Sequence, residues 1–391
     1  MCRVIKSAGI YHKEIILDEM ISEPLKRFGV LKAFSSPETV GDRRGFGKRD
    51  RMEQVRITIK DIAEELGVST ATVSNVIHGK TKKISDQTVA KVQEKLEESG
   101  YIPNMAAVLL AQNTSKIVCV VLSDDVSYEG KMIEDPFVSG MLNYISKELD
   151  QAGYFMMLKE EPDINQIVRY ASMWNMAGLI LIGYCAVDYE NLRERMHIPF
   201  VVVDAYRNPG KKYSDVGIDN IRGGYLAGEY LLKMGHVRIL YLANSDEDCD
   251  HDRYLGLVEA LEEKGVFSEK EDFKLLSPVK AERLKKYGVI YENMKDYTAA
   301  FLASDVLAVE FMNYLQEKGM RIPEDFSIIG FDDIPLASCV RPALTTISQN
   351  LKERAKKAVQ LLGELMDGTT EGRQEFLDLK LVERESVKQI N

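Results

Sequence analysis

The stretch from residue 58 to residue 79 places apolar residues at helical spacing on both sides of one glycine. Ahead of Gly67, one helix face carries the apolar residues Ile59, Ile62, Ala63 and Leu66. Behind it, the apolar face is formed by Val73, Val76 and Ile77. Because glycine adopts turn conformations without a side-chain clash, the pattern predicts two short helices joined by a tight turn.

Polar residues stand where these two helices begin. Thr58 and Ser69 are suited to N-caps, since a hydroxyl oxygen can accept a backbone N–H at a helix start. The outward positions of the second helix carry short polar or methyl-bearing groups that can reach base edges, namely Thr70, Ala71, Thr72, Ser74, Asn75 and His78. The alternative is an ordinary helical hairpin inside a core. The surface composition favours a helix-turn-helix whose second helix enters a DNA major groove.

A third helix follows, with Ser85 as its cap and Val89, Val92 and Leu96 on its apolar side. The sequence YIPN at residues 101–104 then breaks the pattern, and residues 104–111 are short, apolar and uncapped. An isolated helix of that length is marginal in water, so this segment needs a partner to order it.

With TVSNVI at residues 72–77 and YIPN at residues 101–104, the chain closely resembles the lactose-repressor family of bacterial transcription regulators from about residue 55 to its end. The resemblance implies a DNA-binding headpiece over 52–103 and a hinge over 104–115. In that family the hinge becomes helical only on operator DNA, where Leu110 would wedge into the minor groove. The expected DNA-contacting residues are Thr58, Ser69, Thr70, Ala71, Thr72, Asn75, His78, Lys80 and Leu110. Among them, Asn75 is suited to adenine.

The predicted headpiece is not basic overall. Its acidic residues offset its lysines and include Glu53, Glu64, Glu65, Asp86, Glu94, Glu97 and Glu98. Phosphate contacts therefore depend on helix N-termini and on Arg56, Lys60, Lys80, Lys82 and Lys83. We expect a modest DNA affinity with a shallow dependence on salt.

Residues 1–51 resemble nothing else in the chain and mix KEIILDEMI with a basic GDRRGFGKRDR run. One hypothesis is a misassigned start, with translation beginning at Met52. The alternative is a disordered basic arm that adds non-specific contact with DNA.

From Lys116 onward the pattern changes to apolar strand-like runs alternating with amphipathic helices. The runs are IVCVVLSD, YFMMLKE, AGLILIG, PFVVVDA, ILYLAN, AAFLASD and SIIGFDD. A helix at residues 137–153 carries Phe137, Met141, Ile145 and Leu149 on one stripe. This alternation predicts an α/β fold of parallel sheets covered on both faces, with enough strands for two lobes.

The family resemblance continues at residues 218–239, 253–256 and 327–350. It implies a two-lobed core like that of periplasmic binding proteins, with a small effector bound in the cleft. By that likeness, lobe 1 takes about 117–218 and 349–376, and lobe 2 takes about 219–348 and 377–391.

Several aspartates end apolar strand runs, where ligands sit in open parallel sheets. They are Asp124, Asp204, Asp305, Asp332 and Asp333, and the alternative for each is a helix cap. The resemblance places Asp204, Arg253 and Asp332 at effector-binding positions, Phe137 at an apolar wall, and Ser304 where many relatives carry asparagine. For Phe137, a place in the helix core is a close alternative. Ala205 lacks the ring with which purine-binding relatives stack, and this favours a sugar as the effector.

The bulk properties narrow the picture further. With 391 residues, 45% of them hydrophobic, and a formal charge of −10, the chain has the composition of a soluble protein with more than one domain. The apolar runs are too short for a membrane span, five cysteines are scattered, and no export signal appears, so a cytoplasmic location is expected. The run from Asp246 to Arg253, with Cys249 and His251, reads as a solvated acidic rim rather than a metal site, although such a rim could favour a cationic effector.

No nucleotide-binding fingerprint and no nucleophile with a base partner stands out, so we expect neither a cofactor nor enzyme activity. The sequence favours a homodimeric repressor that binds double-stranded operator DNA under the control of a small effector. Three alternatives are a global catabolite regulator gated by a partner phosphoprotein, a solute-binding protein of transport, and an α/β enzyme.

Overall fold

The computed structural model describes residues 57–77, 79–102, 115–123, 131–184, 186–205, 213–266, 272–368 and 372–390. The chain divides into two compact units, Met1–Tyr101 and Ile102–Asn391, which we call the headpiece unit and the core unit. Residues 1–51, His78, Leu110 and Asp124 lie outside the described residues. Within the described ranges, no helix combines the length and apolar character needed to cross a bilayer.

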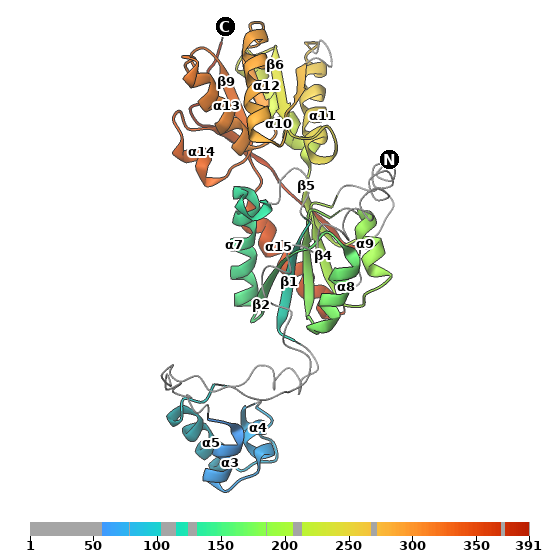
Figure 1. The fold of residues 1–391 in the computed structure, drawn as a ribbon, viewed down its shortest axis with the longest axis vertical. Coiled ribbons are helices and arrows are strands. Elements are labelled where there is room, and N and C mark those ends of the chain that lie inside the picture. The colour runs from blue at the N-terminus through green and yellow to red at the C-terminus, as the bar shows by residue number, and fades with distance from the viewer. Residues whose placement is uncertain are drawn as a thin grey trace, which may run out of the picture. The chain divides into compact units, whose positions relative to one another are not determined.

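The headpiece unit holds three helices, drawn in blue in Figure 1: α3 (Ile59–Leu66), α4 (Thr70–Ile77) and α5 (Asp86–Glu98). Their common core consists of Ile62, Ala63, Val73, Val76 and Val92, all buried. The helical periodicity of the sequence therefore predicted all three helices and the residues that they bury.

The caps of the headpiece also follow the prediction. The Thr58 hydroxyl accepts the backbone N–H of Asp61 at 3.3 Å, and the Asp61 carboxylate accepts the N–H of Thr58 at 2.8 Å. Gly67 ends α3 with φ of 64°, a left-handed conformation that suits glycine. Ser69 accepts the N–H of Thr72 at 3.1 Å and so caps α4. These local bonds give partners to backbone N–H groups that the helix starts would otherwise leave unsatisfied.

The core unit contains two six-stranded sheets, which define lobes 1 and 2 (Figure 1). In sheet order, lobe 1 has β11 (Gln374–Leu377), β5 (Asp215–Ile218), β4 (Phe200–Val203), β3 (Gly178–Ile182), β1 (Ile117–Leu122) and β2 (Phe155–Glu160). Lobe 2 has β12 (Lys380–Val382), β10 (Thr345–Ser348), β9 (Ser327–Asp332), β8 (Ala299–Leu302), β6 (Ile239–Ala243) and β7 (Phe273–Leu275).

Helices cover both faces of each sheet. In lobe 1, α7 (Pro136–Gln151) and α15 (Leu351–Met366) pack on one face, and α8 (Ile164–Met173) and α9 (Ala186–Arg193) on the other, while η2 (Met132–Glu134) leads into α7. In lobe 2, α10 (Asn220–Lys233) and α11 (Asp248–Glu263) face α12 (Lys280–Asn293), α13 (Asp305–Glu317) and α14 (Pro335–Cys339) across the sheet. The predicted two-lobed α/β architecture is confirmed.

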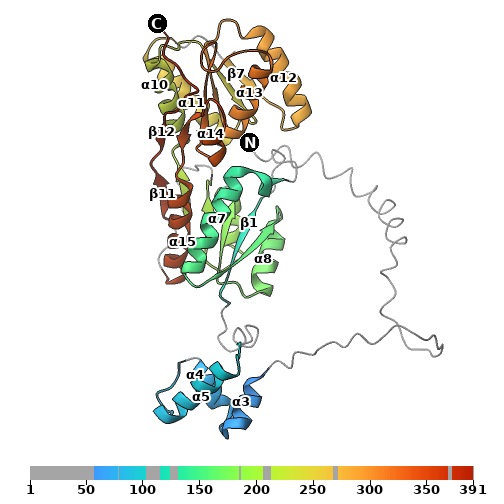
Figure 2. The ribbon, with the colours of Figure 1, turned by 90° about the vertical axis from the view of Figure 1, so that its left-hand side faces the viewer.

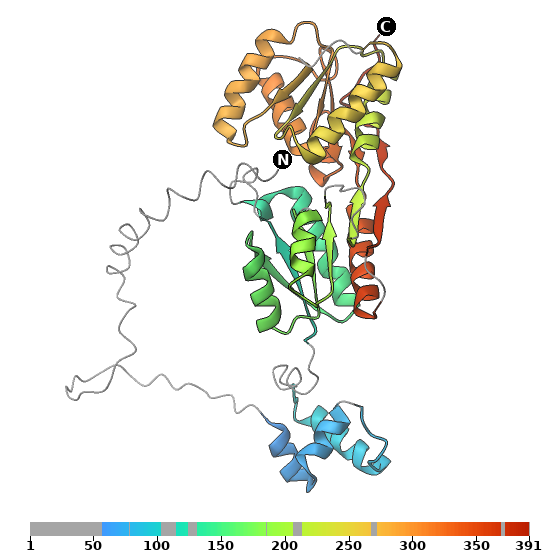
Figure 3. The ribbon, with the colours of Figure 1, turned by 90° about the vertical axis from the view of Figure 1, so that its right-hand side faces the viewer.

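The chain passes between the lobes three times. It leaves lobe 1 after β5, returns between β10 and α15, and crosses again between β11 and β12. Figures 2 and 3 show α15, β11 and β12, in red, along one side of the core unit. Residues at these crossings therefore lie at the junction between the two lobes.

The strands differ from the sequence prediction in two respects. The run at 154–160 was expected to be a buried strand, but β2 is an edge strand whose Phe155 is 61% exposed. In addition, β12 pairs with β10 antiparallel, whereas the other pairings are parallel. An apolar run alone does not reveal which strand lies at the edge, because edge position depends on pairing along the whole sheet.

Helices α10 and α11 cross in direct backbone contact. A Cβ atom on Gly224 would lie 1.8 Å from the carbonyl oxygen of Arg253, and one on Gly256 would lie 1.9 Å from that of Ile221. No side chain larger than hydrogen fits at either position. This close crossing sets the position of Arg253, which lies on the buried side of α11.

We predict that Gly256→Ala destabilises the core unit by about 1–3 kcal/mol, because the new methyl group must push α11 away from α10. Thermal and urea unfolding of the full chain measures this. Gly363→Ala is the matched control, since Gly363 lies inside α15, a Cβ atom added there would have nothing within 4 Å, and helix propensity gives a gain of up to about 1 kcal/mol. Equal stability of the Gly256 variant and wild type would contradict the close crossing.

Candidate functional site

A cleft of about 540 Å³ opens between the two lobes of the core unit. The five residues that the sequence placed at an effector site all line it, namely Phe137, Asp204, Arg253, Ser304 and Asp332. They come from α7, the end of β4, α11, the start of α13 and the end of β9. Residues far apart in the chain thus meet at the carboxyl ends of strands, where ligands bind in open parallel sheets.

Arg253 is 7% exposed and is held on three sides. Its Nε donates to the side-chain oxygen of Asn220 at 3.0 Å, and its Nη1 donates to the Ala303 carbonyl at 2.5 Å. The guanidinium lies 3.8 Å from the centroid of the Phe331 ring, and Asp250 lies 3.7 Å from Nη1. The guanidinium group of Arg253 is therefore held in place before any ligand arrives, and this lowers the entropic cost of binding.

A buried polar chain joins the two lobes beneath the cleft. Gln349, 1% exposed, donates through its Nε2 to the carboxylate of Asp332 and accepts from Arg354 at its Oε1. Arg354, fully buried, in turn forms an ion pair with Asp204. Neither Gln349 nor Arg354 belongs to the set predicted from the sequence. We call Asp332, Gln349, Arg354 and Asp204 the floor network.

Backbone strain coincides with the two ends of this network. Asp204 has φ of 58° and Asp332 has φ of 120°, conformations that residues with a side chain rarely adopt. Such strain costs on the order of 1–3 kcal/mol per residue and persists where the surroundings impose it, often at ligand sites. Burial also raises the pKa of Asp332 well above its usual value, although Arg253 opposes the shift.

Asp215, which opens β5, is a cleft residue that the sequence analysis missed. It is 1% exposed, and its Oδ1 accepts the N–H of Ala205 at 3.0 Å. Its Oδ2 is buried without a hydrogen-bond partner. Burial raises the pKa of this carboxyl to about 7, with the nearby charge of Asp204 acting in the same direction. Its position in a short strand gave no signal in the sequence.

The remaining predicted effector residues have mixed roles. The Phe137 ring borders the cleft, packs on the lobe 1 core, and lies 5.7 Å from the guanidinium of Arg354. The Phe137 ring is therefore part of the cleft wall and part of the lobe 1 core. Ser304 borders the cleft as well, but its hydroxyl caps α13 by accepting the N–H of Leu307 at 3.3 Å.

Two strand-ending aspartates do not face the cleft as expected. Asp305 is fully buried and accepts from the Thr346 hydroxyl at 2.5 Å and the Ile334 N–H at 2.9 Å. Asp333 forms an ion pair with Arg384 at 2.6 Å. Both fix the connection after β9 to its neighbours, so their roles are structural.

The acidic run at 246–253 forms the start of α11 at the cleft margin. Burial raises the pKa of the Cys249 thiol to about 12, so the thiolate that binds metals is disfavoured at neutral pH. Within the described ranges, no group of three or more His, Cys, Asp or Glu side chains is placed to hold a metal ion.

In the headpiece unit, α4 exposes the side chains expected to reach bases. Thr70, Ala71 and Asn75 are exposed on its outer face, and Lys80 is exposed in the following turn. The Thr58 and Ser69 hydroxyls are engaged in capping, and the Thr72 hydroxyl bonds to Ser69 at 2.9 Å. These three side chains therefore have a structural task whether or not they also touch DNA.

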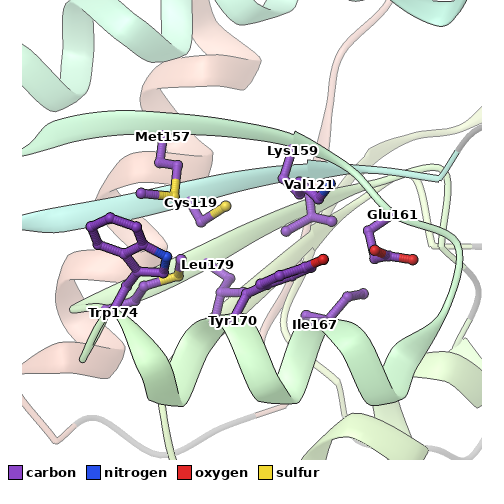
Figure 4. A pocket seen from close by; sticks show the side chains of 10 residues that line it. Cys119, Val121, Met157, Lys159, Glu161, Ile167, Tyr170, Trp174 and Leu179 are labelled. Atoms are coloured by element: carbon purple, nitrogen blue, oxygen red, sulfur yellow. The ribbon is translucent and has the colours of Figure 1, made fainter. Parts of the chain in front are cut away.

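A second, smaller cavity of about 200 Å³ lies in lobe 1 between β2 and α8. Figure 4 shows Met157 and Lys159 on the strand side, with Tyr170 and Trp174 reaching across from the helix. The lining is mostly apolar, and the Lys159 ammonium lies 5.2 Å from the centroid of the Tyr170 ring. None of the predicted effector residues lies here.

A helix-turn-helix with an exposed second helix, together with a two-lobed core around a polar cleft, defines a DNA-binding regulator with a ligand-binding core. The family described as bacterial regulatory proteins, lacI family, matches residues 58–104. The periplasmic binding protein-like domain matches residues 229–387.

Curated relatives match over most of the chain. The transcriptional regulator MalR of Clostridium butyricum is 31% identical over 347 residues, which cover 84% of this chain and 99% of MalR. The transcriptional repressor PurR of Vibrio atlanticus is 32% identical over 350 residues, covering 85% of this chain and 99% of PurR. The chain belongs to the lacI family and is a DNA-binding transcriptional regulator, not an enzyme.

Solved structures share the fold. The lac repressor dimer bound to operator and the anti-inducer ONPF aligns with a TM-score of 0.74 at 24% identity, covering 85% of this chain and 99% of that one. The complex of the transcriptional regulator CelR with cellobiose has a TM-score of 0.63 at 26% identity, covering 85% and 100%. A regulator of Enterococcus faecium with bound ribose has a TM-score of 0.59 at 25% identity, covering 70% and 100%.

We predict that Asp215→Asn stabilises the protein at pH 8 by on the order of 1–3 kcal/mol. The ordinary pKa of this carboxyl is 3.8 and the folded value is about 7, so the folded state holds the proton more tightly than the unfolded chain. Wild-type stability should therefore fall as the pH rises from about 4 to about 7, and the amide removes that loss.

Urea unfolding at pH 4 and pH 8 measures this effect, and the amide keeps the acceptor for the Ala205 N–H. The exposed Asp296→Asn is the matched control and should change nothing at either pH. A variant at Asp215 that is less stable than wild type at pH 8 would show that the buried carboxylate is compensated after all.

Proposed function

We propose that the protein is a dimeric repressor whose grip on operator DNA is controlled by a small hydroxylated effector, a sugar, held in the cleft of the core unit. The observation that carries this proposal is the floor network. It ends in cleft-lining carboxylates on both lobes, Asp204 and Asp332, and so a ligand that contacts either end acts on the packing between the lobes.

The coupling works through lobe closure. A ligand that bonds to Arg253 and Asp332 on lobe 2 and packs on Phe137 of lobe 1 favours one relative position of the lobes. A coupling free energy of about 1–3 kcal/mol changes operator affinity roughly 5- to 150-fold. The same cleft and the same lobe movement serve a ligand that relieves repression and a ligand that strengthens it.

The chemistry of the cleft supports a sugar. Carboxylates accept bonds from paired hydroxyls, while the fixed guanidinium of Arg253 donates to ring or hydroxyl oxygens. An aromatic ring such as Phe137 provides an apolar face for the C–H side of a pyranose. Ala205 lines the cleft where a stacking ring would be needed for a purine. Ribose and cellobiose in the related regulators are consistent with this class.

A second copy of the chain supplies the other half of the DNA-binding surface. Large apolar side chains are exposed along β2 and the end of α8, namely Phe155 (61%), Leu158 (37%), Met173 (65%) and Trp174 (52%). Several large apolar side chains exposed on neighbouring elements favour an interaction surface. The lac repressor in its operator complex is a dimer, and two headpieces would read two half-sites.

The alternatives fit less well. A solute-binding protein of transport has no use for a helix-turn-helix, and this element favours a location with DNA in the cytoplasm. A catabolite regulator gated by a phosphoprotein would need a surface on lobe 1 that receives that partner. The domain division follows from the same reasoning: a headpiece over 52–103, a hinge over 104–115 containing Leu110, and the core after it.

We expect Asn75→Ala to weaken binding to preferred DNA by about 1–3 kcal/mol, roughly 5- to 150-fold, because a bidentate contact to adenine is lost. Binding to random duplex should be unchanged. The assay is fluorescence anisotropy of the full chain on sequences that wild type selects from a random library.

Lys82→Ala is the companion variant, because Lys82 is exposed in the loop beyond α4 and is expected to contact phosphates. It should weaken binding to both kinds of DNA and lower the salt slope by about 1. An Asn75 variant that loses both kinds of binding equally would remove the base-reading role.

Arg253→Ala should leave DNA binding without ligand unchanged and abolish the response to ligand. The first measurement is a thermal-shift screen of wild type against neutral sugars, including ribose and cellobiose, and the second is operator affinity with and without the best hit. Arg321→Ala is the control, because Arg321 pairs with Asp325 on an exposed part of lobe 2. Retention of the full response by the Arg253 variant would contradict the assigned site.

A further inference from the structure

The cleft is lined by more carboxyl side chains than cationic side chains. Nine lining residues carry carboxyl groups: Glu134, Asp135, Asp204, Asp215, Glu247, Asp248, Asp250, Asp252 and Asp332. Only three described lining residues carry cationic groups: Lys131, Arg253 and Arg283. An anionic ligand such as a sugar phosphate would meet a repulsive field in this cleft.

The cationic groups near the cleft are largely committed to the protein. Arg283 forms an ion pair with Glu310 at 2.5 Å and donates to the carbonyl of Pro278 at 2.7 Å. Arg253 is held by Asn220 and Ala303. Arg354 has an Nε without an acceptor, but it is fully buried and does not line the cleft.

The unsatisfied groups that do line the cleft are acceptors. Asp215 Oδ2, on lobe 1, is buried without a partner in a side chain that is 1% exposed. Asn244 Oδ1, which follows β6 in lobe 2, is likewise buried without one. A buried acceptor without a donor destabilises the protein, so each of these atoms favours a ligand that donates hydrogen bonds.

We propose that the effector is a hydroxylated primary amine, an amino sugar, whose ammonium group binds at Asp215. This inference rests on the proposed function of the cleft and narrows its ligand class. An ammonium group supplies three hydrogen-bond donors, one of which can pair with Asp215 Oδ2. Its positive charge also offsets part of the excess of carboxyl groups. The hydroxyl groups occupy the remaining carboxylates and Arg253, and the sugar ring packs on Phe137.

A neutral sugar can satisfy the unpaired acceptors of the cleft but not its excess of carboxyl groups. Its hydroxyls can donate to Asp215 Oδ2, but they bring no positive charge into a partly desolvated site that has more carboxyl groups than cationic ones. A charge-assisted hydrogen bond is roughly twice as strong as a neutral one. The amine should therefore bind more tightly than a parent sugar of the same shape.

The experiment uses calorimetric titration of the full chain with matched sets of ligands: glucosamine, galactosamine and mannosamine, their neutral parents, their N-acetyl derivatives and the parent 6-phosphates. We expect at least one amine to bind about tenfold or more tighter than its parent and its N-acetyl form, with the phosphates weakest. These comparisons need no variant, so a folding defect cannot obscure them.

Asp215→Asn provides the second comparison, because the amide keeps the acceptor for the Ala205 N–H and removes the charge. It should abolish the preference for the amine, so that the amine and its neutral parent bind the variant with similar affinity. Asp296→Asn, an exposed position outside the cleft, should leave the preference intact.

The outcomes separate the two levels of the proposal. Neutral sugars that bind as tightly as their amines, or an Asp215 variant that keeps the preference, would overturn the amine class and leave the sugar-gated regulator standing. Tighter binding of a 6-phosphate would overturn it as well. Binding by no member of the panel would count against both the amine and the proposed effector cleft.

Discussion

The connection between the two lobes of the core unit depends on the bonds made by the buried guanidinium group of Arg354. A fully buried charge is tolerated only with good partners, and Asp204 and Gln349 provide them. Because Gln349 also holds Asp332, this one charge binds the end of β4 in lobe 1 to the end of β9 in lobe 2. Removing one partner of such a pair costs about 3–5 kcal/mol, so the lobes cannot separate at this point without a large penalty. A ligand at Asp204 or Asp332 therefore competes for, or completes, bonds that already join the lobes.

The second constraint is steric and comes from the glycines between α10 and α11. Gly224 and Gly256 allow the two helix backbones to touch, and this brings Arg253 to the wall of the cleft. The stacking on Phe331 and the bond to Ala303 then fix its fork. Backbone contact sets the position of the helix and side-chain bonds set the orientation of the guanidinium, so neither is left to the ligand.

Local patterns in the sequence predicted what is decided locally. Helical spacing indicated the headpiece helices and their buried faces, and apolar runs indicated four of the six strands of lobe 1 and three of the six strands of lobe 2. The resemblance to a known family then placed Arg253 and Asp332 in one cleft. Gln349, Arg354 and Asp215 escaped notice because their roles arise from contacts over long sequence distances. No periodicity or motif shows that a glutamine links two lobes, that an aspartate adopts a φ of 120°, or that a run of apolar residues forms an edge strand.

The two units differ in how well their polar groups are satisfied. In the headpiece unit, Thr58, Ser69 and Ser85 are all engaged in caps, and most charged side chains of the described residues are exposed. In the core unit, unfavourable features gather at the cleft: positive φ at Asp204 and Asp332, and an unpaired carboxylate oxygen at Asp215. Each of these costs stability, and the unpaired oxygen of Asp215 is satisfied by a ligand that enters the cleft and donates a hydrogen bond to it. In the proposed mechanism, a ligand that bonds to both lobes favours one relative position of the lobes, and that position is what controls DNA binding.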